Sequence, residues 1–271
     1  MDLIKEIASL TLLSAVLFGG CQSDSLVSVQ QERGMSPSKQ VTTKPEQETN
    51  SKLKLIGSSE DEQVKLYTVK ETEDAIERVT IDINGRTKDF DWSISHYSGT
   101  EPQLFYADLT GDGKEEAIVI IQIGRGTGLN IYEIHVVNSD NLSEIKVQRY
   151  EDIVAEHIES RVSKNDDGTL AITVNSQGQV GNFNYDFDPA PDYHQDELAF
   201  GGVVIYTLDN HKIKLSLPGS IGISPTYVCD FNITYTFDKA DNEFIVDQIE
   251  VKPFKKRLQT FNSTLPFPKR S

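Results

Sequence analysis

Short runs of alternating apolar and polar residues recur from residue 53 onward, and they predict a protein built mainly of β-strands. The alternation is clearest in residues 212–217 and 231–237, so each of these strands is expected to bury one face. Turn-forming pairs such as Asn84-Gly85, Asp112-Gly113 and Asp167-Gly168 separate the runs. The expected strands are 64–69, 78–83, 90–95, 103–107, 116–123, 131–137, 170–174, 202–208, 212–217, 228–237 and 243–251.

One segment, residues 150–162, departs from this period. Its apolar side chains recur at spacings of one, three and four, which is typical of one face of a helix; they include Ile153, Val154, Ile158 and Val162. The pattern therefore predicts a mainly β fold of antiparallel sheets, sandwich-like or propeller-blade-like, with one short helix near 150–162.

The N-terminal sequence is typical of an export signal. Residues 7–20 carry no charge and are too few to span a bilayer, which is typical of a signal-peptide core. The sequence Phe18-Gly19-Gly20-Cys21 that follows resembles the lipobox of bacterial lipoproteins. This resemblance implies that Cys21 receives diacylglycerol, so that the protein is held by its lipid at the outer face of the bacterial cytoplasmic membrane. An ordinary cleaved signal and a buried N-terminal helix are the alternatives.

Composition divides the rest of the chain. Residues 21–52 are rich in Gln, Ser, Thr, Lys, Glu and Pro and are expected to form a flexible tether. The expected order is a signal peptide over 1–20, the tether over 21–52, a β-rich extracytoplasmic domain over 53–260 and a tail over 261–271. Cys21 and Cys229 are the two cysteines, so acylation of Cys21 leaves Cys229 unpaired and expected to be buried.

Charge excludes one class of function. The chain has 26 Lys and Arg against 42 Asp and Glu, a formal net charge of −16, so it repels the phosphates of nucleic acid unless a basic face is segregated. The C-terminus is locally basic, with Lys252, Lys255, Lys256, Arg257, Lys269 and Arg270. We interpret this run as solvated, with contact to anionic lipid or wall polymer as the alternative.

The strongest chemical signal is the acidic loop of residues 108–116, which precedes an apolar strand. Alternate positions carry oxygen ligands, and Gly113 permits a sharp turn, a combination that suits Ca²⁺. With the strand before it, the loop resembles the FG-GAP and VCBS-type repeat signature. That resemblance implies five ligands: Asp108, Thr110, Asp112, Lys114 through its backbone oxygen, and Glu116. The alternative is a solvated hairpin without an ion.

The wider sequence is similar to surface lipoproteins of spore-forming Gram-positive bacteria. The similarity lies in the lipobox, the tether, the 108–116 loop, the glycine-rich segment 124–128 and the alternating run 131–137. It implies a location rather than a reaction. The glycine-rich segment leads into a strand-like run instead of a helix, so it predicts a wide hairpin loop and not a nucleotide site.

A second acidic loop, residues 185–197, combines carboxylates, aromatic residues and a histidine. It suits a second metal site or a carbohydrate-binding lip, although an exposed loop stiffened by proline is the simpler interpretation. No HExxH or GxSxG motif occurs in the sequence. We therefore expect a non-catalytic domain that binds an envelope protein or glycan and that Ca²⁺ stabilises. The alternatives are an envelope polysaccharide hydrolase using carboxylates such as Asp186, Asp188 and Asp192, and a purely structural surface protein.

Overall fold

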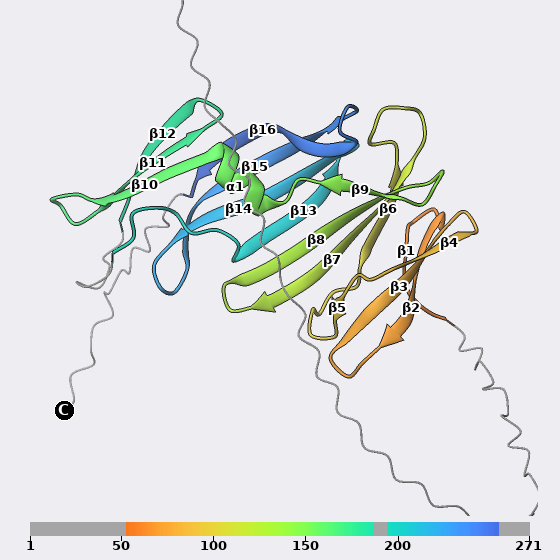
Figure 1. Cartoon of the computed structure of the whole chain (residues 1–271). Coiled ribbons are helices and arrows are strands. Elements are labelled where there is room, and N and C mark those ends of the chain that lie inside the picture. The colour runs from red at the N-terminus through yellow and green to blue at the C-terminus, as the bar shows by residue number, and fades with distance from the viewer. Residues whose placement is uncertain (1–52, 187–193, 255–271) are drawn as a thin grey trace, which may run out of the picture. The chain divides into compact units, whose positions relative to one another are not determined.

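A computed structural model describes residues 53–186 and 194–254 of the 271-residue chain (Figure 1). The expected signal peptide, Cys21, the tether, Asp188, Asp192 and the basic residues beyond position 254 lie outside these ranges. The described strands are β1 Lys54–Ser58, β2 Val64–Glu71, β3 Ala75–Ile83, β4 Arg86–Phe90, β5 Ile94–Ser95, β6 Gln103–Ala107, β7 Glu116–Gly126, β8 Leu129–Asn138, β9 Glu144–Val147, β10 Ile158–Lys164, β11 Leu170–Ser176, β12 Gln179–Tyr185, β13 Val203–Asp209, β14 Lys212–Ile221, β15 Thr226–Asp238 and β16 Glu243–Pro253. The described ranges contain one helix, α1 Tyr150–His157.

The first five strands form an N-terminal antiparallel sheet in the order β1-β2-β3-β4, with β5 beside β3. The turn between β3 and β4 is the expected Asn84-Gly85 pair, whose φ angles are +53° and +81°. Ile83 pairs with Arg86 across this turn, so it is the two-residue hairpin that such residues favour.

An eight-stranded sheet follows, in the order β13-β14-β15-β16-β9-β8-β7-β6. Most of its neighbours are antiparallel, but β9 runs parallel to β16. Strand β13 at one end of this order also pairs in parallel with β8, through Val203 with Asn130 and Val204 with Ile131. The sheet therefore curls until β13 and β8 meet, as the ribbon in Figure 1 shows.

Strand β7 lies between two hydrophobic cores. Its residues Ile118 and Ile120 belong to the main core. This core also contains residues of β13–β16, of a separate three-stranded sheet with the order β10-β11-β12, and Ile153 of α1. Residues Val119 and Ile121 of β7 belong to the N-terminal core, which contains the inner face of the β1–β5 sheet. Because both faces are covered, residues 117–121 form the uninterrupted apolar run Ala-Ile-Val-Ile-Ile instead of an alternating pattern.

The mainly β prediction with one short helix is confirmed, but the helix is shorter than expected. It ends at His157, and residues 158–162 begin β10, which pairs with β11. Ile158 and Val162 are both buried in the main core from this strand. An apolar residue at every fourth position satisfies a strand as well as a helix, and the β-branched side chains favour the strand here.

Several strand boundaries differ from the expected ones. The expected strand 90–95 is interrupted at residues 91–93, and strands β1, β4, β9, β10 and β12 were not expected. Strand β4 shows why, since its sequence Arg-Thr-Lys-Asp-Phe carries no apolar alternation and its first four residues are exposed. The glycine-rich segment forms a tight hairpin and not a wide loop, because Gly126 pairs directly with Leu129.

Candidate functional site

The candidate calcium loop connects β6 to β7, where Ala107 pairs with Glu116. Asp108 holds the loop from within, because its Oδ1 accepts the Gly111 amide at 2.7 Å and its Oδ2 accepts the Gly113 amide at 3.0 Å. Gly111 and Gly113 have φ angles of +70° and +87°, a conformation that favours glycine. The local sequence therefore folds into a turn organised by a carboxylate.

Glu116 closes the same loop from its C-terminal end. Its side chain is fully buried, and its Oε2 accepts the amides of Leu109 at 2.9 Å and Thr110 at 3.3 Å. Burial raises the pKa of this carboxyl above its ordinary value, while the two amide donors oppose the shift. Glu116 is thus an internal acceptor for the loop backbone.

Of the remaining predicted ligands, Thr110 is half-buried and its Oγ1 donates to Glu116 Oε1 at 3.4 Å, whereas Asp112 and Lys114 lie at the exposed tip. Asp112 Oδ1 accepts the Lys114 amide at 2.9 Å, and the Lys114 ammonium pairs with Asp140 in the β8–β9 turn. Among the described residues, no group of three or more His, Cys, Asp and Glu side chains is placed to hold a metal ion. The loop brings Asp108, Thr110, Asp112, Lys114 and Glu116 together along one hairpin, but its carboxylates are engaged with backbone amides. Calcium binding here stays a prediction.

The second acidic loop is described only at its ends, residues 185–186 and 194–197. Its C-terminal end is anchored by Gln195, whose Nε2 donates to the Ser220 carbonyl at 3.0 Å, and by the Asp196 carbonyl, which accepts the Val162 amide at 2.6 Å. Two of the three carboxylates of the hydrolase hypothesis, Asp188 and Asp192, lie outside the described ranges.

A second candidate binding site lies on strands β13–β16. In each of these strands the alternate apolar residues enter the main core, and the other side chains form what we call the polar face. Strand pairing continues from β7 through β8, β9 and β16, so the polar face lies on the same side of the sheet as Val119 and Val137. The N-terminal sheet covers that side over β7 and β8, whereas on β15 and β16 Asn232 is partly exposed and Lys252 is exposed.

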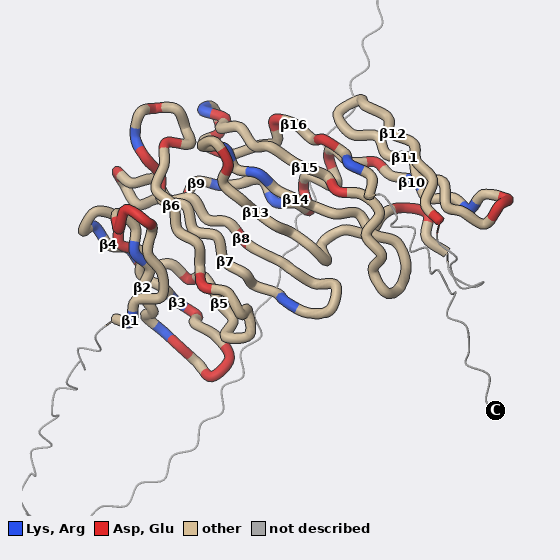
Figure 2. Tube along the Cα trace, turned by 180° about the vertical axis from the view of Figure 1, so that it is seen from behind, with Lys and Arg blue, Asp and Glu red and all other residues tan. Residues whose placement is uncertain are grey.

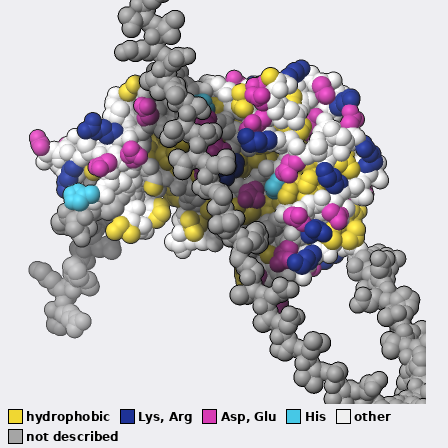
Figure 3. Space-filling view, viewed as in Figure 1, with side chains coloured by type: hydrophobic (Ala, Val, Ile, Leu, Met, Phe, Trp, Pro, Cys, Tyr) yellow, Lys and Arg dark blue, Asp and Glu magenta, His cyan; other side chains and the backbone are white. Residues whose placement is uncertain are grey.

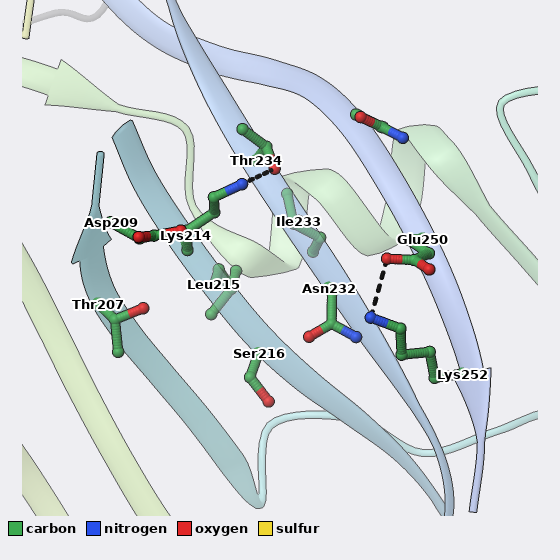
Figure 4. Close-up of a pocket in the computed structure, with 11 residues that line it drawn as sticks. Thr207, Asp209, Lys214, Leu215, Ser216, Asn232, Ile233, Thr234, Glu250 and Lys252 are labelled. Atoms are coloured by element: carbon green, nitrogen blue, oxygen red, sulfur yellow. Dashed lines mark hydrogen bonds and ion pairs between the residues drawn. The ribbon is translucent and has the colours of Figure 1, made fainter. Parts of the chain in front are cut away.

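The polar face contains a hollow of about 370 Å³. Its lining is dominated by hydroxyl, amide and charged side chains, as Figure 4 shows, and comprises Thr207, Asp209, Lys214, Leu215, Ser216, Asn232, Ile233, Thr234, Gln248, Glu250 and Lys252. Lys214 Nζ donates to Thr234 Oγ1 at 2.8 Å, and Lys252 Nζ lies 2.9 Å from Glu250 Oε2. These contacts hold the long side chains while leaving Asn232 facing the hollow between them.

Charge in this hollow is balanced. Two carboxylates, Asp209 and Glu250, accompany two ammonium groups, Lys214 and Lys252. Figure 2, which views the chain from behind, likewise shows acidic and basic positions interspersed across β13–β16. Beside the hollow, Asp230 accepts hydrogen bonds from Ser216 Oγ at 2.9 and 3.0 Å, and partial burial raises its pKa. A balanced, hydrogen-bonding surface suits a neutral polar ligand better than a polyanion.

The sequence held a signal for this face. The polar positions of the alternating runs 212–217 and 231–237 supply side chains of the polar face. These side chains come together only because β14, β15 and β16 pair with one another. Cys229 occupies the opposite, apolar half of β15, where it is fully buried, and burial raises its pKa to about 12. The expectation that Cys229 is buried is confirmed.

Comparison of the chain with protein-family models, with curated protein sequences and with solved structures gives no match. Within the described ranges, no helix has the length and apolar character needed to cross a bilayer. Figure 3 shows acidic and basic side chains mixed over the visible face, with apolar side chains between them.

Proposed function

We propose that the protein is a lipid-anchored extracytoplasmic domain of a bacterial envelope that binds a neutral glycan on its polar face, without catalysing a reaction. The observation that carries the proposal is the hollow on β13–β16. Its volume of about 370 Å³ is within the range of small-ligand sites, about 300–1,000 Å³. Hydroxyl and amide groups line it on rigid strands, which is the arrangement that recognises the hydroxyl groups of a sugar.

The charge of the chain supports a neutral glycan over an anionic wall polymer. The net charge of −16 opposes the approach of a polyanion, and the hollow itself has no excess of basic groups. The location is supported by the sequence around Cys21, which resembles a lipobox. An anchored domain with an exposed polar face would hold the envelope polymer close to the membrane.

The test is co-sedimentation of the full chain with purified peptidoglycan, before and after chemical removal of covalently attached anionic polymers. We expect binding to survive this removal and to be competed by soluble N-acetylglucosamine oligosaccharides. The Asn232→Ala variant should bind about fivefold more weakly, because loss of one hydrogen-bonding side chain costs about 1 kcal/mol. Asn182→Ala is the matched control, since Asn182 is also a strand asparagine but lies on β12.

Loss of binding when the anionic polymers are removed would contradict the proposal, as would equal binding by the two asparagine variants.

The lipid anchor at Cys21 is tested by a separate experiment. Radiolabelled palmitate should be incorporated into the full chain in a Gram-positive host and not into Cys21→Ser; labelling of both proteins would exclude Cys21 as the lipidation site.

A further inference from the structure

Strands β8 and β13 are neighbours over only two residue pairs, and beyond them a gap opens in the sheet. Val203 of β13 pairs with Asn130 of β8, and Val204 pairs with Ile131. Further along the same edge of β8, the next described pair joins Val136 to Ile145 of β9. Strand β13 meanwhile continues beside β14 on its other edge. Residues 132–135 of β8 and 206–208 of β13 therefore border a gap that no described strand fills. We call this gap the slot.

Backbone groups of β8 point into the slot. Successive strand residues direct their N–H and C=O groups to opposite edges, so residues two apart share an edge. The Asn130 amide donates to Gly202 O at 2.8 Å across to β13, and the Asn138 amide donates to Ser143 O at 2.9 Å toward β9. Between them, Tyr132 and Ile134 direct their N–H and C=O groups to the same edge.

The same reasoning applies to β13. Asp209 pairs with Lys212 across a two-residue turn, so Asp209 and Thr207 direct their backbone groups toward β14. Tyr206 and Leu208 then direct theirs toward the slot. Two residues from each strand thus offer donors and acceptors to the gap, and in the described ranges no backbone hydrogen bond from another strand meets them.

The slot contains a hollow of about 470 Å³ with largely apolar walls. Ile131, Ile134 and Val147 line it together with three tyrosines, Tyr132, Tyr150 and Tyr206. Backbone polar groups among apolar side chains cost free energy unless they find a partner, about 1–3 kcal/mol for each group left unpaired. An extended peptide supplies these partners on both of its edges, and four strand residues span about 13 Å.

Charge at the rim selects the kind of peptide. Glu133 and Glu151 border the slot and are exposed. Arg149 is the single Lys or Arg in the lining, and it already lies 3.4 Å from Asp152. With a chain charge of −16, the rim therefore favours a basic segment. We propose that the slot binds an extended, Lys- or Arg-flanked segment of a partner polypeptide, which adds a strand between β8 and β13.

This inference is independent of the glycan proposal, because the hollow within the slot shares no lining residue with the hollow on the polar face. It makes a first prediction for the free protein. Amide exchange measured by NMR should be faster at Tyr132 and Ile134 than at Glu133 and His135, whose backbone groups face β7. Equal, slow exchange at all four amides would show that the edge is already occupied and would overturn the proposal.

The binding experiment titrates the full chain with the synthetic peptide Lys-Lys-Val-Thr-Val-Thr-Lys-Lys. Matched controls replace every Lys by Glu, or N-methylate the Val and Thr amides of the basic peptide. We expect the basic peptide to bind, to slow exchange at Tyr132 and Ile134, and to lose affinity in high salt. The double variant Glu133→Lys, Glu151→Lys should bind the basic peptide about fivefold or more weakly, because two exposed attractive pairs with the peptide lysines become repulsive. Both positions are exposed, so the fold should survive these changes.

The control peptides separate the outcomes. Equal binding by the acidic peptide would remove the charge argument, and equal binding by the N-methylated peptide would remove strand addition. Absence of binding by the basic peptide at 1 mM overturns the proposal. Concentration-dependent protection of Tyr132 and Ile134 in the protein alone would identify a second copy of the chain as the occupant and would equally overturn it.

Discussion

Shortening Val119 tests the position of β7 between two cores. Val119 is fully buried in the N-terminal core, and its neighbour Ile118 is fully buried in the main core. Val119→Ala removes two buried carbons, about 1.6 kcal/mol of transfer free energy, and the residual cavity brings the expected loss to about 2–3 kcal/mol. Ile118→Ala removes three carbons and should cost about 3–4 kcal/mol. Val180→Ala is the control, since that side chain is 63% exposed and should change stability by less than about 0.5 kcal/mol.

The assay is urea unfolding followed in parallel by far-UV circular dichroism and by tryptophan fluorescence. Trp92 is the single tryptophan, and its ring stacks on Phe90 at 4.4 Å and on His135 of β8 at 4.1 Å, so its emission reports on the N-terminal core. Because β7 belongs to both cores, both variants should lower the two midpoints together. A shift of the circular dichroism midpoint by Ile118→Ala without a shift in fluorescence would refute this coupling.

Three further predictions concern single side chains. In a Cys21→Ser chain, the Cys229 thiol should resist DTNB at pH 8 until urea unfolds the protein, because burial raises its pKa to about 12; rapid labelling of the folded chain would contradict its burial. Burial also raises the folded pKa of Glu116, so this group's stabilising contribution is complete below its ordinary pKa and is lost as pH rises through the folded value. Glu116→Gln should remove that decline in urea titrations between pH 4 and 7 with a chelator present, and an unchanged pH profile would refute the assignment. If the 108–116 loop binds calcium, millimolar calcium should raise the melting temperature of the wild type and not of the Asp112→Ala variant. An unchanged melting temperature of the wild type would show that the loop is a hairpin without a calcium site.

Local pattern predicted much of the fold, because hydrophobic periodicity marks any strand with one buried face. Strands β6, β14 and β15 were anticipated for this reason, as was the buried position of Cys229. The pattern is weaker where a strand is short and exposed, as in β4, or where strand and helix periods agree, as at Ile158 and Val162. In those places pairing with a neighbouring strand decides the structure, and no local window of sequence contains that information.

The candidate sites divide in the same way. The residues of the 108–116 loop are contiguous, so the sequence could place them together, although it could not show that Asp108 and Glu116 accept backbone amides. The polar face and the slot are non-local. The first depends on β14, β15 and β16 lying side by side, and the second on the parallel contact between β8 and β13.

The central claim, a glycan-binding polar face, is tested most directly by lysine footprinting on peptidoglycan. The full chain would be acetylated briefly, free and bound, and the modification of each lysine measured by mass spectrometry. Lys214 and Lys252 line the hollow and should lose most of their reactivity on binding, whereas Lys88 on β4 and Lys114 in the 108–116 loop should keep theirs. Protection of Lys88 or Lys114 with Lys214 and Lys252 still reactive in the bound protein would contradict the claim.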